Sequence, residues 1–174
     1  MPVNIISTQQ EQHPTFHLHE DLLRDRILFL LQKIGRADST VSVVFMDDPT
    51  MTAYNQQYRS KPGPTNVLSF PAAEGQDIME GVIPNELAGD ELGDILISVE
   101  TAQKEALEKK CTLHQRLTEL LIHGLLHLIG YDHEISDEQA DIMFNRENKL
   151  LRSLQEHHIY HMRRNNMPQL AINV

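Results

Sequence analysis

Three histidines, two glycines and an aspartate lie within the segment HGLLHLIGYDH at positions 123–133. His123 and His127 are four residues apart, so on a helix their imidazoles share one face, about one turn apart. Gly130 can adopt the left-handed conformation that ends a helix, and the chain then returns His133 toward the pair. The spacing therefore predicts that the three imidazoles converge on one point.

Converging imidazoles at the end of an apolar helix are typical of a metal site. A buried imidazole needs a partner for each ring nitrogen, and a divalent metal supplies one to several rings at once. Three histidines that leave a fourth position open form the catalytic rather than the structural arrangement of zinc. We therefore expect one Zn²⁺ per chain, held by His123, His127 and His133, although three imidazoles also bind other divalent transition metals.

The pattern H-x-x-x-H-x-x-G-x-x-H has the ligand spacing of the metzincin proteases. Those enzymes carry a glutamate, their general base, directly after the first histidine, and this chain has Gly124 there. A metzincin-like hydrolase acting on peptides would need a base from elsewhere, such as Asp94 or Glu100.

The elements that position these residues follow from the apolar periodicity. Residues 112–128 are apolar nearly all round, which indicates a buried helix. Asp48 and Pro49 are typical of an N-cap and a first helical turn. The expected strands span 3–7, 40–46, 66–70 and 94–99, and the expected helices span 20–34, 48–58, 100–109, 112–128 and 136–154.

Strands that come early and helices that come late predict an α+β fold. We expect a mixed sheet of about four strands covered by helices, with the metal site at the end of the buried helix. No repeat or linker divides the chain, so residues 1–174 are predicted to form a single domain, with residues after about 155 as a C-terminal extension.

Composition limits the location and the partners. Cys111 is the only cysteine, and the N-terminal residues lack the features of a secretory signal. No apolar segment reaches the roughly 18 residues of a membrane span, so we expect a cytoplasmic protein without a membrane partner. The net charge is −10, and eight of the acidic residues lie between Pro62 and Gln103, a stretch without Lys or Arg. The rest of the chain carries −2, so a local basic surface for nucleic acid is not excluded.

Three segments together resemble the YbeY family of bacterial endoribonucleases and ribosomal RNA maturation factors. These are HGLLHLIGYDH, YRSKPGPTNVLSFP at 58–71 and GDILIS at 93–98. The family commonly has Asp where this chain has Pro62 and Asn66, so no charged role is carried over to those two positions.

The resemblance implies a zinc-dependent endoribonuclease that cuts single-stranded RNA and acts in 3′-end maturation of 16S ribosomal RNA and in ribosome quality control. It also implies that His123, His127 and His133 are metal ligands, that Arg59 is catalytic, and that the partners are ribosomal RNA and small ribosomal subunit proteins. A planar guanidinium matches a phosphate. The alternative is that Arg59 is a structural residue that caps a helix C-terminus. A second alternative is a non-catalytic ribosome-assembly factor with a structural metal.

Overall fold

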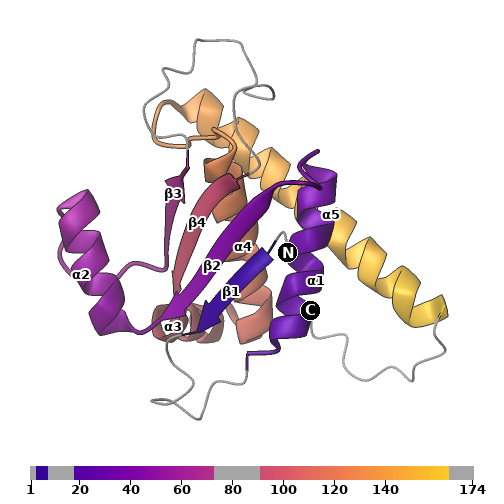
Figure 1. The fold of residues 1–174 in the computed structure, drawn as a ribbon, viewed down its shortest axis with the longest axis horizontal. Helices are drawn as coiled ribbons and strands as arrows, with labels where there is room; N and C mark the ends of the chain where they lie inside the picture. The colour runs from indigo at the N-terminus through magenta and orange to yellow at the C-terminus, as the bar shows by residue number, and fades with distance from the viewer. Residues whose placement is uncertain (1–2, 8–17, 73–90, 165–174) are drawn as a thin grey trace.

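The structure is a computed structural model that describes residues 3–7, 18–72 and 91–164, with side chains described as far as residue 157. It has the predicted α+β architecture, a four-stranded mixed sheet with helices around it (Figure 1). The strands are β1 (Val3–Ser7), β2 (Thr40–Met46), β3 (Val67–Pro71) and β4 (Glu91–Ser98). The helices are α1 (Glu20–Lys33), α2 (Asp48–Arg59), α3 (Val99–Lys109), α4 (Leu113–Leu128) and α5 (Asp137–Arg164). Most of the acidic segment, residues 73–90, lies outside the described residues.

The strand order of the sheet is β1-β2-β4-β3. β1 pairs with β2 and β2 with β4 in parallel, whereas β3 runs antiparallel to β4 at the edge. The central strands are apolar on both faces, as expected for parallel strands covered on both sides. Val43 and Ile95 contribute to one hydrophobic cluster, while Met46 and Leu96 contribute to a second one.

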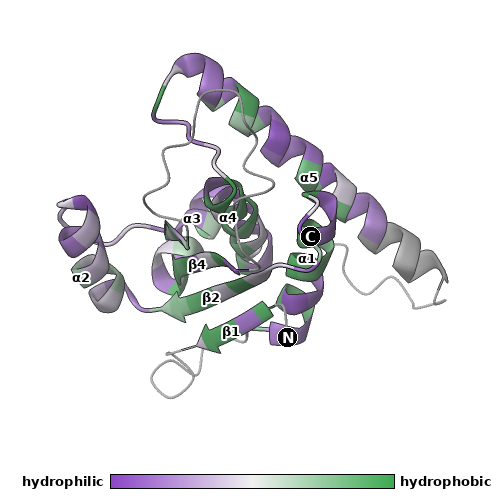
Figure 2. Ribbon diagram, turned by 45° about the horizontal axis from the view of Figure 1, so that its top comes forward, coloured by the Kyte–Doolittle hydropathy of each residue, from purple (hydrophilic) through white to green (hydrophobic). Residues whose placement is uncertain are grey.

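Helices cover the two faces unequally. α1 and α4 pack on the face that carries the larger cluster, and α2 covers the other face through Met51. α4 is hydrophobic over most of its length, whereas α5 is largely hydrophilic (Figure 2). This contrast fits their places, because α4 is enclosed between the sheet and α5, which packs across α4 and α1.

Several expected boundaries were wrong, and β4, for example, begins at Glu91 rather than at residue 94. The N-cap of α2 is Asp47, whose side chain accepts a hydrogen bond from the Thr50 backbone, and Asp48 is the first helical residue. The Asp48 carboxylate instead accepts hydrogen bonds from Ser98 and Thr101, so it ties α2 to the start of α3. The last helix continues to Arg164, because residues 155–164 contain neither Gly nor Pro. Within the described ranges, no helix has the length and apolar character needed to cross a membrane.

Candidate metal centre

The end of α4 brings the three histidines together. A capping box formed by Thr112 and Gln115 starts this helix. At its other end, the N–H of Gly130 bonds the His127 carbonyl and the N–H of Tyr131 bonds the Leu126 carbonyl, both at 3.0 Å. This is a Schellman ending, and Gly130 has the positive φ of 97° that it requires. The turn reverses the chain and returns His133 toward α4.

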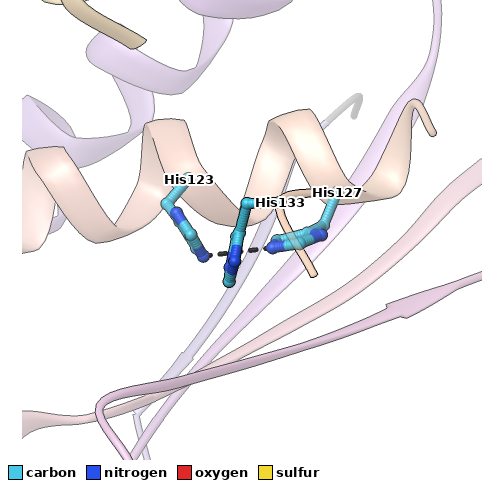
Figure 3. Close-up of side chains that lie close together, drawn as sticks. All are labelled: His123, His127 and His133. Carbon is cyan, nitrogen blue, oxygen red and sulfur yellow. Dashed lines mark hydrogen bonds between the residues drawn. The ribbon is translucent and has the colours of Figure 1, made fainter. Parts of the chain in front are cut away.

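The imidazoles of His123, His127 and His133 face one another below α4 (Figure 3). Their ring centroids are separated by 4.6 Å, 5.2 Å and 5.1 Å. One nitrogen from each ring lies within 4.8 Å of the other two, which makes these residues a possible metal-binding group among the described residues. His123 and His127 are partly buried and His133 is exposed, so the group opens to solvent on the His133 side.

The electrostatic environment keeps His127 neutral. Burial lowers the pKa of His127, and the neighbouring His123 and His133 lower it further. Asp132 and a hydrogen bond with the Tyr131 backbone oppose this effect without cancelling it. A neutral imidazole is the form that binds a metal, so this environment favours ligation at neutral pH.

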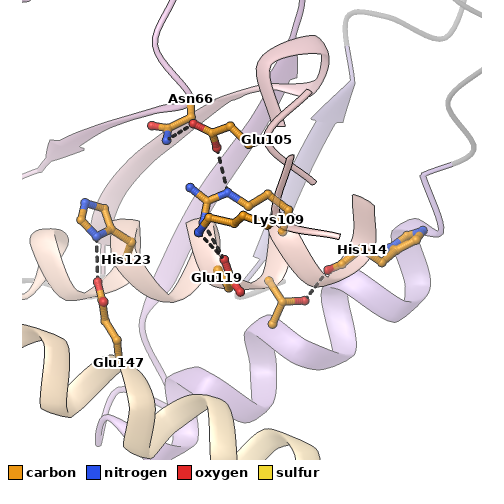
Figure 4. A network of polar contacts seen from close by, with 9 residues as sticks. Asn66, Glu105, Lys109, His114, Glu119, His123 and Glu147 are labelled. Carbon is orange, nitrogen blue, oxygen red and sulfur yellow. Dashed lines mark hydrogen bonds and ion pairs between the residues drawn. The ribbon is translucent and has the colours of Figure 1, made fainter. Parts of the chain in front are cut away.

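Glu147 of α5 orients His123, and the sequence did not single it out. Its Oε1 lies 2.7 Å from His123 Nδ1 (Figure 4), while His123 Nε2 lies 3.1 Å from His127 Nε2 (Figure 3). A carboxylate that accepts the Nδ1–H leaves Nε2 with its lone pair free, as in carboxylate–histidine–zinc sites. The only available signal was the general need of a ligand histidine for such a partner, which does not select one acid among many.

Gly124 explains the missing metzincin glutamate. This residue is buried against the sheet, and a Cβ there would lie 2.8 Å from Ile95 Cγ2 and 3.1 Å from Ser69 Oγ. A side chain fits between α4 and the two strands at this point only if Ile95 or Ser69 shifts. The position therefore serves close packing rather than acid–base chemistry.

The two other acids considered as bases do not face the histidines. Ile95 lies under Gly124, and successive side chains of a strand alternate between faces, so Asp94 projects to the opposite face of the sheet. Glu100 accepts a hydrogen bond from the Asp48 backbone at the start of α2. Asp132 accepts the Glu134 N–H at 2.8 Å, a turn role, and contributes to His127 only through its charge.

Arg59 reaches the same region from α2. Its Nη2 lies 2.9 Å from Glu134 Oε1, and Glu134 directly follows His133. α2 ends at Ser60 in a left-handed conformation, and no described hydrogen bond joins the Arg59 side chain to a carbonyl of α2. The geometry therefore favours a site role for Arg59 over the helix-capping alternative, and its catalytic role stays a prediction.

Comparison with known proteins gives the family. Residues 5–155 match the family model described as Endoribonuclease YbeY. The chain belongs to the YbeY family. An Endoribonuclease YbeY of Zymomonas mobilis is 45% identical over 127 residues, which cover 72% of this chain and 69% of the relative. One from Acinetobacter baumannii is 39% identical over 155 residues, which cover 88% of this chain and 95% of the relative.

A solved structure has the same fold as this YbeY-family chain. The solution structure of TM1509 from Thermotoga maritima superposes with a TM-score of 0.58, covering 97% of this chain and 98% of that one. The sequence identity is 23%, so this likeness concerns the fold alone. The family resemblance predicted from the three sequence segments is thus confirmed.

Proposed function

We propose that this YbeY-family protein is a zinc-dependent endoribonuclease that cleaves single-stranded RNA in the cytoplasm. The proposal includes 3′-end maturation of 16S ribosomal RNA and ribosome quality control, with small ribosomal subunit proteins as partners. The observation that carries it is the convergence of His123, His127 and His133 on one solvent-open point, with Arg59 paired to Glu134, the residue that follows His133. Family membership supports hydrolysis of RNA phosphodiester bonds.

The histidine group fits a zinc ion. Two nitrogens bound to one tetrahedral zinc at about 2.0–2.1 Å lie about 3.3 Å apart. The Nε2 atoms of His123 and His127 are 3.1 Å apart, and Glu147 occupies Nδ1 of His123, so the ligand nitrogen is already defined. When bound, zinc supplies a Lewis acid that activates water near neutral pH and polarises a phosphoryl oxygen.

The residues around the histidines provide binding and charge stabilisation. Arg59 offers a planar fork of N–H donors that matches a phosphate and stabilises the negative charge that develops during cleavage. Both side chains of its ion pair with Glu134 are exposed to solvent, so a phosphate can replace the Glu134 carboxylate at little cost in free energy. Glu134 thus holds Arg59 near the site until RNA binds.

A single strand suits this site better than a duplex. A flexible strand can bring one phosphodiester to the histidines, whereas opening an A-form duplex costs stacking energy. A protein with a net charge of −10 has little electrostatic attraction to offset that cost. Weak intrinsic binding also fits a role for ribosomal proteins, whose added contacts raise the effective concentration of the RNA.

The test compares one labelled RNA sequence as a free strand, as a perfect duplex and as a duplex with a single-stranded tail. The zinc-loaded protein should cut the free strand and the tail at fixed salt, and leave the duplex intact. Equal cutting of all three forms, or cutting of peptides alone, contradicts the proposed substrate. Absence of all cleavage by metal-loaded protein that still binds ribosomes would support the assembly-factor alternative.

A further inference from the structure

A cavity lies behind the histidine group, between β3, α3, α4 and α5. Its volume is about 290 Å³, and His123 and Glu147 form part of its wall. The two nitrogens of His123 face different partners, since Nε2 points to His127 (Figure 3) and Nδ1 to Glu147 (Figure 4). The space, called here the His123 cavity, is therefore one imidazole ring away from the proposed metal position.

The cationic groups of the His123 cavity are paired with carboxylates. Arg116 is largely buried and donates to Glu105 at 2.8 Å and to Glu119 at 2.6 Å. Burial lowers the pKa of Arg116, but these hydrogen bonds and charges outweigh it, so the net shift is upward. Lys109 lies 3.3 Å from the same Glu119. With Glu147 also in the wall, the cavity presents no excess of positive charge and is a poor site for a phosphate.

Two amide side chains in the wall have a defined orientation. Asn66 Nδ2 donates to Glu105 Oε1 at 3.0 Å, and Asn148 Nδ2 donates to the Phe144 carbonyl at 2.9 Å. Because these partners only accept hydrogen bonds, each amide carbonyl oxygen must lie on the other side of its amide group. Within the described part of the chain, neither oxygen receives a donor. The cavity thus offers acceptors for the N–H groups of a neutral polar ligand.

Phe144 gives the His123 cavity an aromatic rim. Its side chain is 62% exposed although α5 has a buried face available to apolar residues such as Met143 and Leu150. A single exposed apolar residue is ordinary, but this ring borders a cavity that also has oriented amides and an apolar floor that includes Leu120. An aromatic ring beside amide acceptors is typical of sites that bind an unstacked base.

We propose that the His123 cavity binds the nucleobase of a nucleotide next to the scissile phosphate. The inference rests on the proposed function, because it places that phosphate at the histidine group and its neighbouring base across the His123 ring. The volume lies near the lower end for ligand pockets and suits one base rather than several. Free amide oxygens favour bases with an exocyclic amino group, so cytosine should bind better than uracil.

Binding of free nucleosides tests the cavity without any cleavage. Cytidine and uridine, which differ at the base C4 substituent, are titrated into isotope-labelled metal-free protein and followed by NMR. Cytidine should shift the signals of Phe144 and Asn148 and bind more tightly than uridine. Phe144→Ala should weaken binding by roughly five- to a hundredfold, the effect of losing one stacking ring.

The matched control is Leu107→Ala, which removes another strongly exposed apolar side chain that does not line the cavity. This variant should bind cytidine as the wild type does. No shift of cavity signals by either nucleoside, or equal weakening by both substitutions, overturns the proposal.

Cleavage of RNA with a missing base then links the cavity to the reaction. Single abasic nucleotides are placed in turn on each side of the cleaved bond. Phe144→Ala should lower kcat/KM on intact RNA by roughly five- to a hundredfold. On the one RNA that lacks the base bound by the His123 cavity, the variant and the wild type should have the same kcat/KM. An effect that persists at every abasic position contradicts the inference. Failure of the wild type to cleave any RNA contradicts the proposed function instead, and the nucleoside titration still decides the cavity.

Discussion

Arg59 and Glu134 form an ion pair between segments that are 75 residues apart in the chain. Their side chains are 40% and 53% exposed, so the pair contributes little to stability. Its importance lies in position, because it ties the Arg59 guanidinium to the residue that follows His133.

Arg59→Ala should therefore leave the fold and the metal content intact and reduce RNA cleavage by about ten- to a thousandfold, the cost of one charge-stabilising donor. Arg59→Lys should restore only part of the rate, since lysine lacks the bidentate fork. Rates are measured under single-turnover conditions, with circular dichroism and elemental analysis as controls. Loss of folding in Arg59→Ala would instead assign Arg59 a structural role.

The low pKa of His127 predicts how stability depends on pH. Burial is the main cause, and in the unfolded chain the pKa returns to about 6.5. At a pH between the pKa of His127 in the folded protein and its pKa in the unfolded chain, His127 is protonated only in the unfolded chain. The free energy of unfolding of the metal-free protein should therefore fall as the pH drops below about 6.5, and this contribution should level off below the folded pKa.

Urea unfolding in the presence of a chelator, from about pH 5 to pH 8, measures this dependence. His127→Gln removes the titrating group, so the free energy of unfolding should depend less on pH in this variant than in the wild type. Curves of equal slope in both proteins would mean that the pKa of His127 is not lowered by folding.

At the scale of elements, α4 has two tasks that compete for space. It presents histidines on one side and packs closely on β3 and β4 through Gly124 on the other. Gly124→Ala should lower the free energy of unfolding by up to about 2 kcal/mol, because overpacking costs about 1–3 kcal/mol and the gain in helix propensity offsets about 1 kcal/mol of it. Denaturant unfolding measures the change. A more stable variant would indicate that Ile95 and Ser69 move aside freely.

The junction of β3, α3 and α4 depends on Asn66. Its amide donates to Glu105, which also binds Arg116, so one carboxylate joins three elements. Asn66→Asp would replace this hydrogen bond with two adjacent carboxylates and should cost about 1–3 kcal/mol of unfolding free energy. Asn66→Ala, which removes the hydrogen bond without adding charge, should cost less. Wild-type stability of Asn66→Asp in thermal and urea unfolding would contradict this account.

At the scale of the whole molecule, the local pattern predicted much of the architecture. The bounds of β1 and β2 agree with the sequence because β-branched and apolar runs mark buried strands. The approach of His123, His127 and His133 was also predictable, since helix periodicity and one glycine turn determine it.

The contacts that could not be predicted from the sequence join segments that are far apart in the chain. Glu147 lies 24 residues from His123, and it meets that ring only because α5 packs back across α4. The Arg59–Glu134 pair and the His123 cavity likewise depend on how α2, β3 and α5 are placed relative to α4 and the turn after it. Asp47 was missed for a local reason, because two adjacent aspartates precede Pro49 and either one can cap a helix.

The whole fold thus supports one centre, in which the sheet and α5 hold the histidines and α2 supplies Arg59. The most direct test is a titration of zinc into metal-free protein while cleavage of a labelled single-stranded RNA is measured. Cleavage should be absent without metal and rise to a plateau at about one zinc per chain, and His123→Ala should bind zinc weakly and stay inactive. Metal-free protein that cleaves as fast as the zinc-loaded form, or wild-type rates in His123→Ala, would contradict the account.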